Sequence, residues 1–232
     1  MATITVERRF NGPPDTGNGG YSAGLIATAI GADVAVRLQQ PIPLARALTI
    51  AKSGDGTWDV RADDAVIATA RAVTIEASAP QLPPYSAALA ASRHYVGFDQ
   101  HSWPGCFVCG PRRELHDGLR IFPGAIEGAA LHAAPWIPDA SLDDGAGRVR
   151  PEFIWAALDC PGYFATAHPA PALLGELAVH IERLARIDER CVIVSWPIGR
   201  DGRKHRAGTA LFGADGERCA IGVATWIELK PA

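Results

Sequence analysis

The chain has 232 residues, of which 48% are hydrophobic and 20% charged, and its formal net charge is −3. This length allows one large domain or two small ones with a sizeable core. The slightly acidic balance argues against nucleic acid as a partner, because phosphate binding needs a basic surface.

No run approaches the ~18 uninterrupted apolar residues of a membrane span, and residues 1–9 lack an apolar signal segment. Five cysteines, an odd number, do not make a disulfide framework, so we expect a cytoplasmic protein with no membrane partner.

The first half of the chain predicts one buried helix among short strands. Residues 4–7 alternate as in a strand, and residues 11–20 are rich in glycine, proline and asparagine, which is turn chemistry. Residues 21–30 form a run of small and apolar residues that indicates a helix ending at Gly31. Four further strands are predicted at residues 34–38, 45–51, 57–61 and 66–76.

The stretch from residue 77 to residue 97 holds three prolines and has weak patterning. Such a stretch is typical of a connection between two parts of a chain. We therefore divide the protein into a first unit of residues 1–80, a linker of residues 81–98 and a second unit of residues 99–232.

The second half repeats the order of the first. Strands are predicted at residues 119–122 and 129–133, before an apolar helix around Asp159. Four more strands follow, at residues 173–184, 190–198, 205–212 and 218–229. Residues 68–76 align with residues 220–228, with Ala, Ala, Ile and Glu at matching positions, and duplication is the better account of this shared order. A strand, a helix and an antiparallel meander predict an α+β fold in which a curved sheet wraps around the helix.

Asp159 is the only charged residue in an apolar stretch from residue 153 to residue 165. A carboxylate there must be paired, protonated or used, because burying it ionised and alone is very unfavourable. At helical spacing Trp155 and Tyr163 lie on its face, where they would desolvate it and raise its pKa. The alternative is an aspartate at the one solvent-facing position of a core helix. Pro161 predicts a kink in that helix just after Asp159.

Cys106 and Cys109 form one Cys-x-x-Cys pair, with His101 and His116 on either side. Such a group can bind zinc, although structural zinc sites usually have paired clusters at stricter spacings. The alternative is a turn before the next strand, and we favour the turn and expect no metal. The other three cysteines are interpreted as small core residues: Cys160, Cys191 and Cys219.

A buried helix wrapped by an antiparallel sheet, present twice, resembles the double hotdog fold of acyl-CoA thioesterases. Members of this family often carry His-Gly-Gly at the helix N-terminus and an acidic residue nine positions after the histidine. The first half has the turn Asn18-Gly19-Gly20 but Ala27 at the acidic position. The second half has Asp159 but Arg150-Pro151-Glu152 in place of the glycine turn. Each half keeps the component that the other lacks, which predicts one composite site formed by Gly20 and Asp159.

The resemblance implies hydrolysis of an acyl-CoA or acyl carrier thioester, with coenzyme A only as part of the substrate and no separate cofactor. Gly19 and Gly20 would donate backbone N–H groups to the oxyanion. Asp159 would position or deprotonate the attacking water, and Asn18 would orient a carbonyl or water. The resemblance also implies a homo-oligomer formed through the hotdog sheets. Residues assigned to the substrate pocket are Tyr21, Trp155, Tyr163, His180 and Thr225, the last two from the order of elements.

Two other functions stay open on the sequence. A hotdog dehydratase or hydratase needs a histidine paired with a carboxylate, and neither predicted helix offers one. A non-catalytic acyl-binding module is favoured by the absence of the Thr and Gln that accompany the aspartate in enzymes of the thioesterase II layout. Binding of acyl-CoA without turnover would identify the module.

Overall fold

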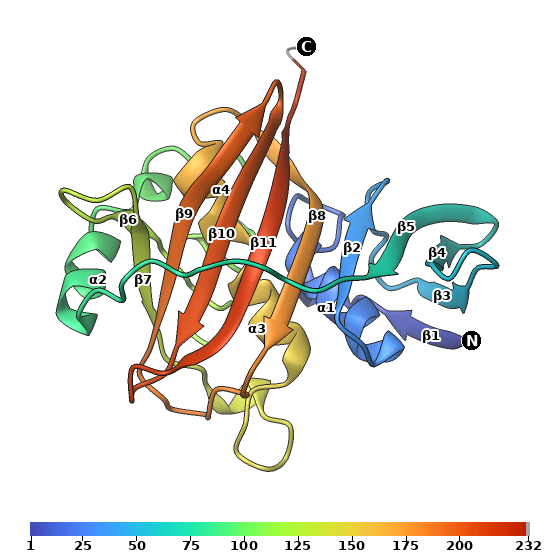
Figure 1. The fold of residues 1–232 in the computed structure, drawn as a ribbon, viewed down its shortest axis with the longest axis horizontal. Helices are drawn as coiled ribbons and strands as arrows, with labels where there is room; N and C mark the ends of the chain where they lie inside the picture. The colour runs from blue at the N-terminus through green and yellow to red at the C-terminus, as the bar shows by residue number, and fades with distance from the viewer. Residues whose placement is uncertain (231–232) are drawn as a thin grey trace.

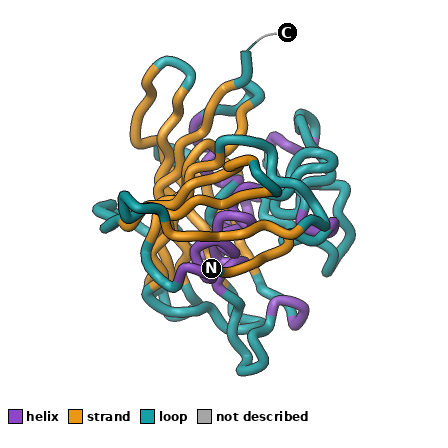
Figure 2. Tube along the Cα trace, turned by 90° about the vertical axis from the view of Figure 1, so that its right-hand side faces the viewer, coloured by secondary structure: helices purple, strands orange, loops and turns teal. Residues whose placement is uncertain are grey.

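The computed structural model describes residues 1–230, which form one continuous antiparallel sheet with the main helices on one side of it (Figure 1). Within these residues the sheet has 11 strands, in the order β1-β3-β4-β5-β2-β8-β11-β10-β9-β7-β6. The strands are β1 (Ala2–Thr5), β2 (Val34–Leu38), β3 (Ala47–Lys52), β4 (Trp58–Ala62), β5 (Ala65–Ala72), β6 (Gly124–Ala125), β7 (His132–Trp136), β8 (Ala172–Ile181), β9 (Cys191–Asp201), β10 (Lys204–Phe212) and β11 (Arg218–Glu228). The helices are α1 (Gly19–Ile30), α2 (Tyr85–Ser92), α3 (Pro151–Ala157) and α4 (Cys160–Thr166). Figure 2 shows the largest group of helical segments in the middle of the molecule, with most strands on the left and most of the long loops on the right.

The two halves repeat one strand order, as the aligned segments predict. Across the sheet the first half runs β2-β5-β4-β3-β1 and the second runs β8-β11-β10-β9-β7, so that β5 corresponds to β11. The halves meet where β2 pairs with β8, with Ala35 opposite Ala178 and Val36 opposite Leu177. This pairing fuses two curved sheets into one and brings both buried helices to the same side.

Helices α1 and α3 cross at close range because two glycines one turn apart on α1 face α3. A Cβ added at Gly20 would overlap the Cβ of Asp159. A Cβ added at Gly24 would lie 2.7 Å from both the Cα of Glu152 and the Cβ of Trp155. These separations are below van der Waals contact, so only glycine permits the crossing. The crossing sets the N-terminal end of α1 against Asp159.

The apolar stretch around Asp159 is two helices rather than the single kinked helix that was expected. Asp159 has φ −84° and ψ −85°, outside the helical region. Pro161 lies in the first turn of α4, where its missing N–H leaves no hydrogen bond unmade. It therefore starts a helix instead of bending one. Because the chain breaks at Asp159, the register that would set Trp155 and Tyr163 on one face is lost.

The segment expected to be an irregular linker contains helix α2. Its Ala88 packs in a second, smaller hydrophobic cluster with side chains of β7, β9 and β10, among them Ala133 and Val192. Strand β5 ends at Ala72, four residues before the predicted end, and residues 73–84 then cross the outer face of the sheet to reach α2 (Figure 1). No helix within residues 1–230 is long and apolar enough to cross a membrane.

The strand expected at residues 119–122 is absent from the described chain. Leu119 and Ile121 donate their N–H groups to the carbonyl oxygens of Phe107 and Val108, at 2.8 and 2.9 Å, which ties this segment to the loop of the Cys-x-x-Cys pair. Arg120 between them has φ 53°, which no strand residue adopts. The strand expected at residues 129–133 forms three residues later, as β7.

Candidate active site

Asp159 lies against the N-terminal end of α1, although the two come from different halves of the chain. The Gly20 N–H donates to Asp159 Oδ2 at 2.9 Å, and the Asn18 Nδ2 group donates to the same oxygen at 3.1 Å. The other carboxylate oxygen, Oδ1, is buried and has no hydrogen-bond partner within residues 1–230. The arrangement therefore fixes one oxygen of a buried carboxylate and leaves the second without a donor.

Asn18 is the N-cap of α1, and the cap determines which way its amide points. Its Oδ1 accepts a hydrogen bond from the Tyr21 N–H at 2.9 Å, the usual contact of an N-cap side chain. Since the amide oxygen is used in this way, the amide nitrogen must face Asp159. Asn18 therefore holds the carboxylate, instead of meeting a substrate carbonyl or water as expected.

The surroundings of Asp159 favour its neutral form. Asp159 is 1% exposed, and burial raises its pKa from 3.8 to about 7. The hydrogen bond from the Gly20 N–H opposes this rise because it stabilises the charged form, the nearby Cys106 adds to it, and Asn18 opposes it again. A carboxyl group with a pKa near neutrality can both accept and return a proton.

The two glycines of the turn take different roles. The Gly20 N–H donates to Asp159, so it is not free to bind an oxyanion as expected. Gly19 provides the first amide of α1, and no hydrogen bond from this amide is found within residues 1–230. A free N–H group at a helix N-terminus carries partial positive charge. Of the two glycines, Gly19 is therefore the one that can receive an oxyanion.

A cavity of about 430 Å³ lies beside Asp159. Asn18, Gly19 and Asp159 line it, together with the polar side chains of Gln39 and His101. The volume and the mixture of an apolar wall with a few polar groups are typical of small-molecule sites. The apolar wall is drawn from both halves of the chain and includes Leu38, Pro41, Ile42, Tyr163, Leu173, Leu174, Trp226 and Ile227.

Of the five side chains expected in the substrate pocket, Tyr163 lines the cavity and two helix residues do not. Tyr21 lies in an aromatic cluster of the core, its ring stacked on Phe10 with centroids 4.1 Å apart. Trp155 packs against α1 at Gly24. The break between α3 and α4 explains the difference, because it turns Trp155 away from the face that Tyr163 shares with Asp159.

His180 and Thr225 also lie outside the cavity. His180 pairs with Asp33, with 2.7 Å between Nδ1 and Oδ2, and both side chains are about half exposed. On β11 the residues that line the cavity are Trp226 and Ile227, and Thr225 is not among them. The order of elements selects the correct strands, but the position of a residue along its strand decides whether its side chain reaches the cavity.

The structure brings Cys160 to the Cys-x-x-Cys pair, a grouping that the sequence did not indicate. The sulfur atoms of Cys106, Cys109 and Cys160 all lie within 4.8 Å of one another, and all three residues line the cavity. Hydrogen bonds with the Cys109 and Cys160 side chains hold the pKa of the Cys106 thiol well below its ordinary value, whereas burial raises the pKa of Cys109 and the hydrogen bond with Cys106 raises the pKa of Cys160. The spacing of cysteines along the sequence could not reveal this cluster, because Cys160 begins a helix far along the chain from Cys106 and Cys109.

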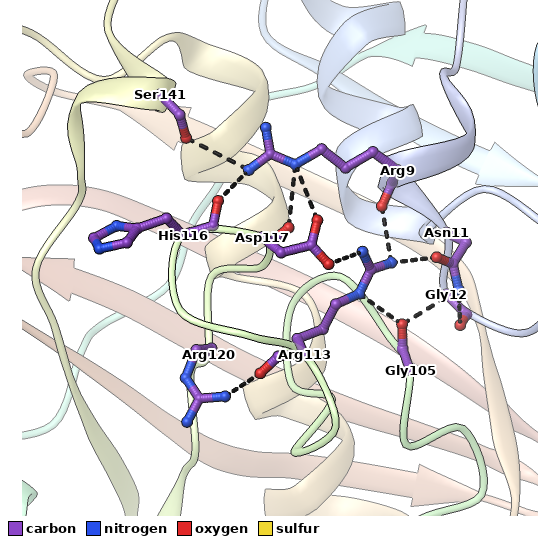
Figure 3. Close-up of polar contacts among 9 residues, drawn as sticks. All are labelled: Arg9, Asn11, Gly12, Gly105, Arg113, His116, Asp117, Arg120 and Ser141. Carbon is purple, nitrogen blue, oxygen red and sulfur yellow. Dashed lines mark hydrogen bonds and ion pairs between the residues drawn. The ribbon is translucent and has the colours of Figure 1, made fainter.

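Arg113 fastens the loop of residues 104–120, which carries the Cys-x-x-Cys pair, to the N-terminal segment (Figure 3). Its guanidinium donates to the carbonyl oxygens of Arg9 and Gly105, both at 2.9 Å, and pairs with Asp117 at 2.8 Å. Arg9 reaches the same loop from the other side and donates to the Asp117 carbonyl at 3.1 Å. The loop is therefore held in place by charged hydrogen bonds between the two halves.

Removing this fastening should destabilise the protein. Arg113→Ala is expected to lower the free energy of unfolding by about 3 kcal/mol, because it leaves the carbonyl oxygens of Arg9 and Gly105 without their charged donor and removes one of the two guanidinium partners of Asp117. Arg112→Ala is the matched control: its side chain is exposed, so we expect a change within ~0.5 kcal/mol. Urea denaturation of both variants measures the difference, and equal stability would contradict the role given to Arg113.

A scan against protein-family models found no match, and neither did a search of the curated proteins. Among solved structures, the chain is similar to a tesB protein of Mycobacterium avium subsp. paratuberculosis, with a TM-score of 0.59, 13% identity, and coverage of 93% of this chain and 88% of that one. This similarity spans nearly the whole molecule. The expected α+β fold of two tandem hotdog units is confirmed.

Two other solved structures are similar over about half of this chain. One is a protein of the thioesterase superfamily, with a TM-score of 0.44 and 15% identity over 48% of this chain and 55% of that chain. The other is a Streptococcus mutans protein bound to acetyl CoA, with a TM-score of 0.43 and 10% identity over 50% of this chain and 97% of that chain.

Proposed function

We propose that this protein is an acyl-CoA thioesterase-like hydrolase with one composite active site between its two halves. One observation carries the proposal: the Asp159 carboxylate is held at Oδ2 by Gly20 and Asn18 of the other half, while its buried Oδ1 has no donor within residues 1–230. A fixed carboxylate with one free oxygen, on the wall of an apolar cavity, is suited to hold a water molecule for attack.

The reaction follows from these positions. A water molecule donates a hydrogen bond to Asp159 Oδ1 and attacks the thioester carbonyl carbon, and the carboxylate takes the proton. The carbonyl oxygen becomes an oxyanion, which the free Gly19 N–H stabilises. The tetrahedral intermediate then collapses, the carbon–sulfur bond breaks, and the proton held by Asp159 passes to the leaving thiolate. The products are a carboxylic acid and a thiol, and no side-chain nucleophile is consumed.

The cavity supports a thioester with an apolar acyl group. Its wall beyond the site is mostly apolar, from Leu38 and Ile42 in the first half to Leu174 and Ile227 in the second. An acyl chain buries apolar surface there, which favours binding. Coenzyme A and acyl carrier protein are the two carriers that present such a thioester.

Turnover of a panel of acyl-CoA thioesters tests the proposal directly. We expect release of free thiol from at least one chain length, measured with a thiol-reactive dye, and binding of the same compounds by calorimetry. Binding without turnover across the panel would overturn the hydrolase and identify a non-catalytic acyl-binding protein. Turnover of acyl carrier protein thioesters alone would assign the carrier.

A further inference from the structure

Three cysteine sulfurs converge on one point in the cavity wall. Cys106 and Cys109 come from the loop of residues 104–120, and Cys160 is the first residue of α4. The three sulfurs lie within 4.8 Å of one another, and those of Cys106 and Cys160 are 3.8 Å apart. In a tetrahedral zinc site with Zn–S bonds of about 2.3 Å, neighbouring sulfurs are about 3.8 Å apart. The cluster therefore has the dimensions of a metal site.

The groups around the sulfurs are hydrogen-bond donors. Trp103 N–H donates to Nδ1 of His101 at 3.0 Å, so the ring proton of His101 is on Nε2, which contacts the Cys109 sulfur at 3.3 Å. The Nδ2 group of Asn18 lies 3.8 Å from the Cys106 sulfur. Donors aimed at sulfur stabilise thiolates, and thiolates that bind a metal usually have such partners.

The turn between Cys106 and Cys109 is closed tightly enough to place both sulfurs on one side. Gly110 N–H donates to the Cys106 carbonyl oxygen at 3.0 Å. A Cβ at Gly110 would lie 2.6 Å from both the Cys106 nitrogen and the Pro104 carbonyl oxygen, so the turn needs glycine. Two sulfurs are thus set by local backbone geometry, and α4 supplies the third.

We propose that Cys106, Cys109 and Cys160 bind one zinc ion as thiolates, with its fourth position open to the cavity. Three sulfur ligands select a thiophilic divalent cation over magnesium or calcium. Three protein ligands and one exchangeable position are the arrangement of an open zinc site. His101 stands beside the ligands as a hydrogen-bond donor to Cys109. The ion would link the Cys-x-x-Cys loop to α4 immediately next to Asp159, and this inference does not depend on the proposed hydrolysis.

Metal analysis of the full-length, untagged protein tests the proposal. The protein is purified under reducing conditions without chelator. We expect about one zinc ion per chain when the metal content is measured by inductively coupled plasma mass spectrometry. Cys106→Ser, Cys109→Ser and Cys160→Ser should each lose the zinc. Cys191→Ser and Cys219→Ser are matched controls, since these cysteines are equally buried but lie outside the cluster, and should keep it. His101→Ala should keep the stoichiometry and weaken zinc affinity by about 10–100-fold.

Cobalt replacement makes the test independent of variants that fold poorly. Co²⁺ added to wild-type protein stripped of metal should give a thiolate-to-cobalt charge-transfer band that one equivalent of Zn²⁺ abolishes. Wild-type protein that neither holds zinc nor gives this band would overturn the proposal. Loss of zinc from the two control variants to the same extent as from the cluster variants would also overturn it. A disulfide within the cluster instead of a bound metal, found in protein purified under reducing conditions, would overturn it as well.

Discussion

Asp159→Asn should lower kcat for acyl-CoA hydrolysis by about 10²–10⁴-fold, the usual contribution of a general base. Asparagine has nearly the same shape, and its amide oxygen can still accept hydrogen bonds from Gly20 and Asn18. It cannot take a proton from water at neutral pH. The expected loss is therefore in kcat, with KM little changed, because the apolar wall of the cavity is intact. Steady-state kinetics on the best substrate of the panel measures both parameters.

The same variant should fold at least as well as the wild type. Asp159 is buried with one oxygen that lacks a partner, and removing a charge from such a place relieves an unfavourable burial. Asp201→Asn, at the exposed last residue of β9, is the control and should change neither activity nor stability. Hydrolysis by Asp159→Asn at the wild-type rate would show that Asp159 is not the base.

Gly20→Ala should displace Asp159 from the N-terminal end of α1 while most of the molecule stays folded. The new Cβ would overlap the Cβ of Asp159 and lie 2.9 Å from the carbonyl oxygen of Trp155, so α1 must move away from α3. Such overpacking usually lowers the free energy of unfolding by about 1–3 kcal/mol. A displacement of ~1 Å can lower the rate of a positioned reaction about 10²-fold, and we expect at least this loss in kcat.

Gly24→Ala separates the effect on the site from the effect on the fold. This glycine makes the same crossing one turn further along α1, but a Cβ there would meet Glu152 and Trp155 rather than Asp159. We expect a similar loss of stability with a much smaller loss of activity. Both variants are assayed at a temperature where circular dichroism shows them folded. Equal losses of activity in the two variants would mean that Gly20 has no special place in the site.

Most of the sheet can be predicted from the sequence because strand alternation and hairpin turns act over a few residues. The alignment of residues 68–76 with residues 220–228 is enough to make β5 and β11 counterparts. Helix α2 is harder to predict, because its run of small residues has no clear apolar face. The prediction of a strand at residues 119–122 is wrong for another reason. The backbone N–H groups of this segment bond to carbonyl groups of a loop, and the alternation of side chains along the sequence does not distinguish such partners from those in a strand.

The amino-acid sequence is enough to show that the glycine turn and the acid of the candidate site come from different halves, because each half has only one of them. Only the folded structure shows that the Gly20 N–H donates to Asp159, and that within residues 1–230 the Gly19 amide makes no hydrogen bond. The fold also places Tyr163 in the cavity wall and keeps Tyr21 and Trp155 out of it. Sequence patterns report local periodicity, whereas these outcomes depend on where α3 ends, on the register of strands and on how two glycines let α1 approach α3. For the same reason, the position of Cys160 next to the Cys-x-x-Cys pair can be seen only in the folded structure.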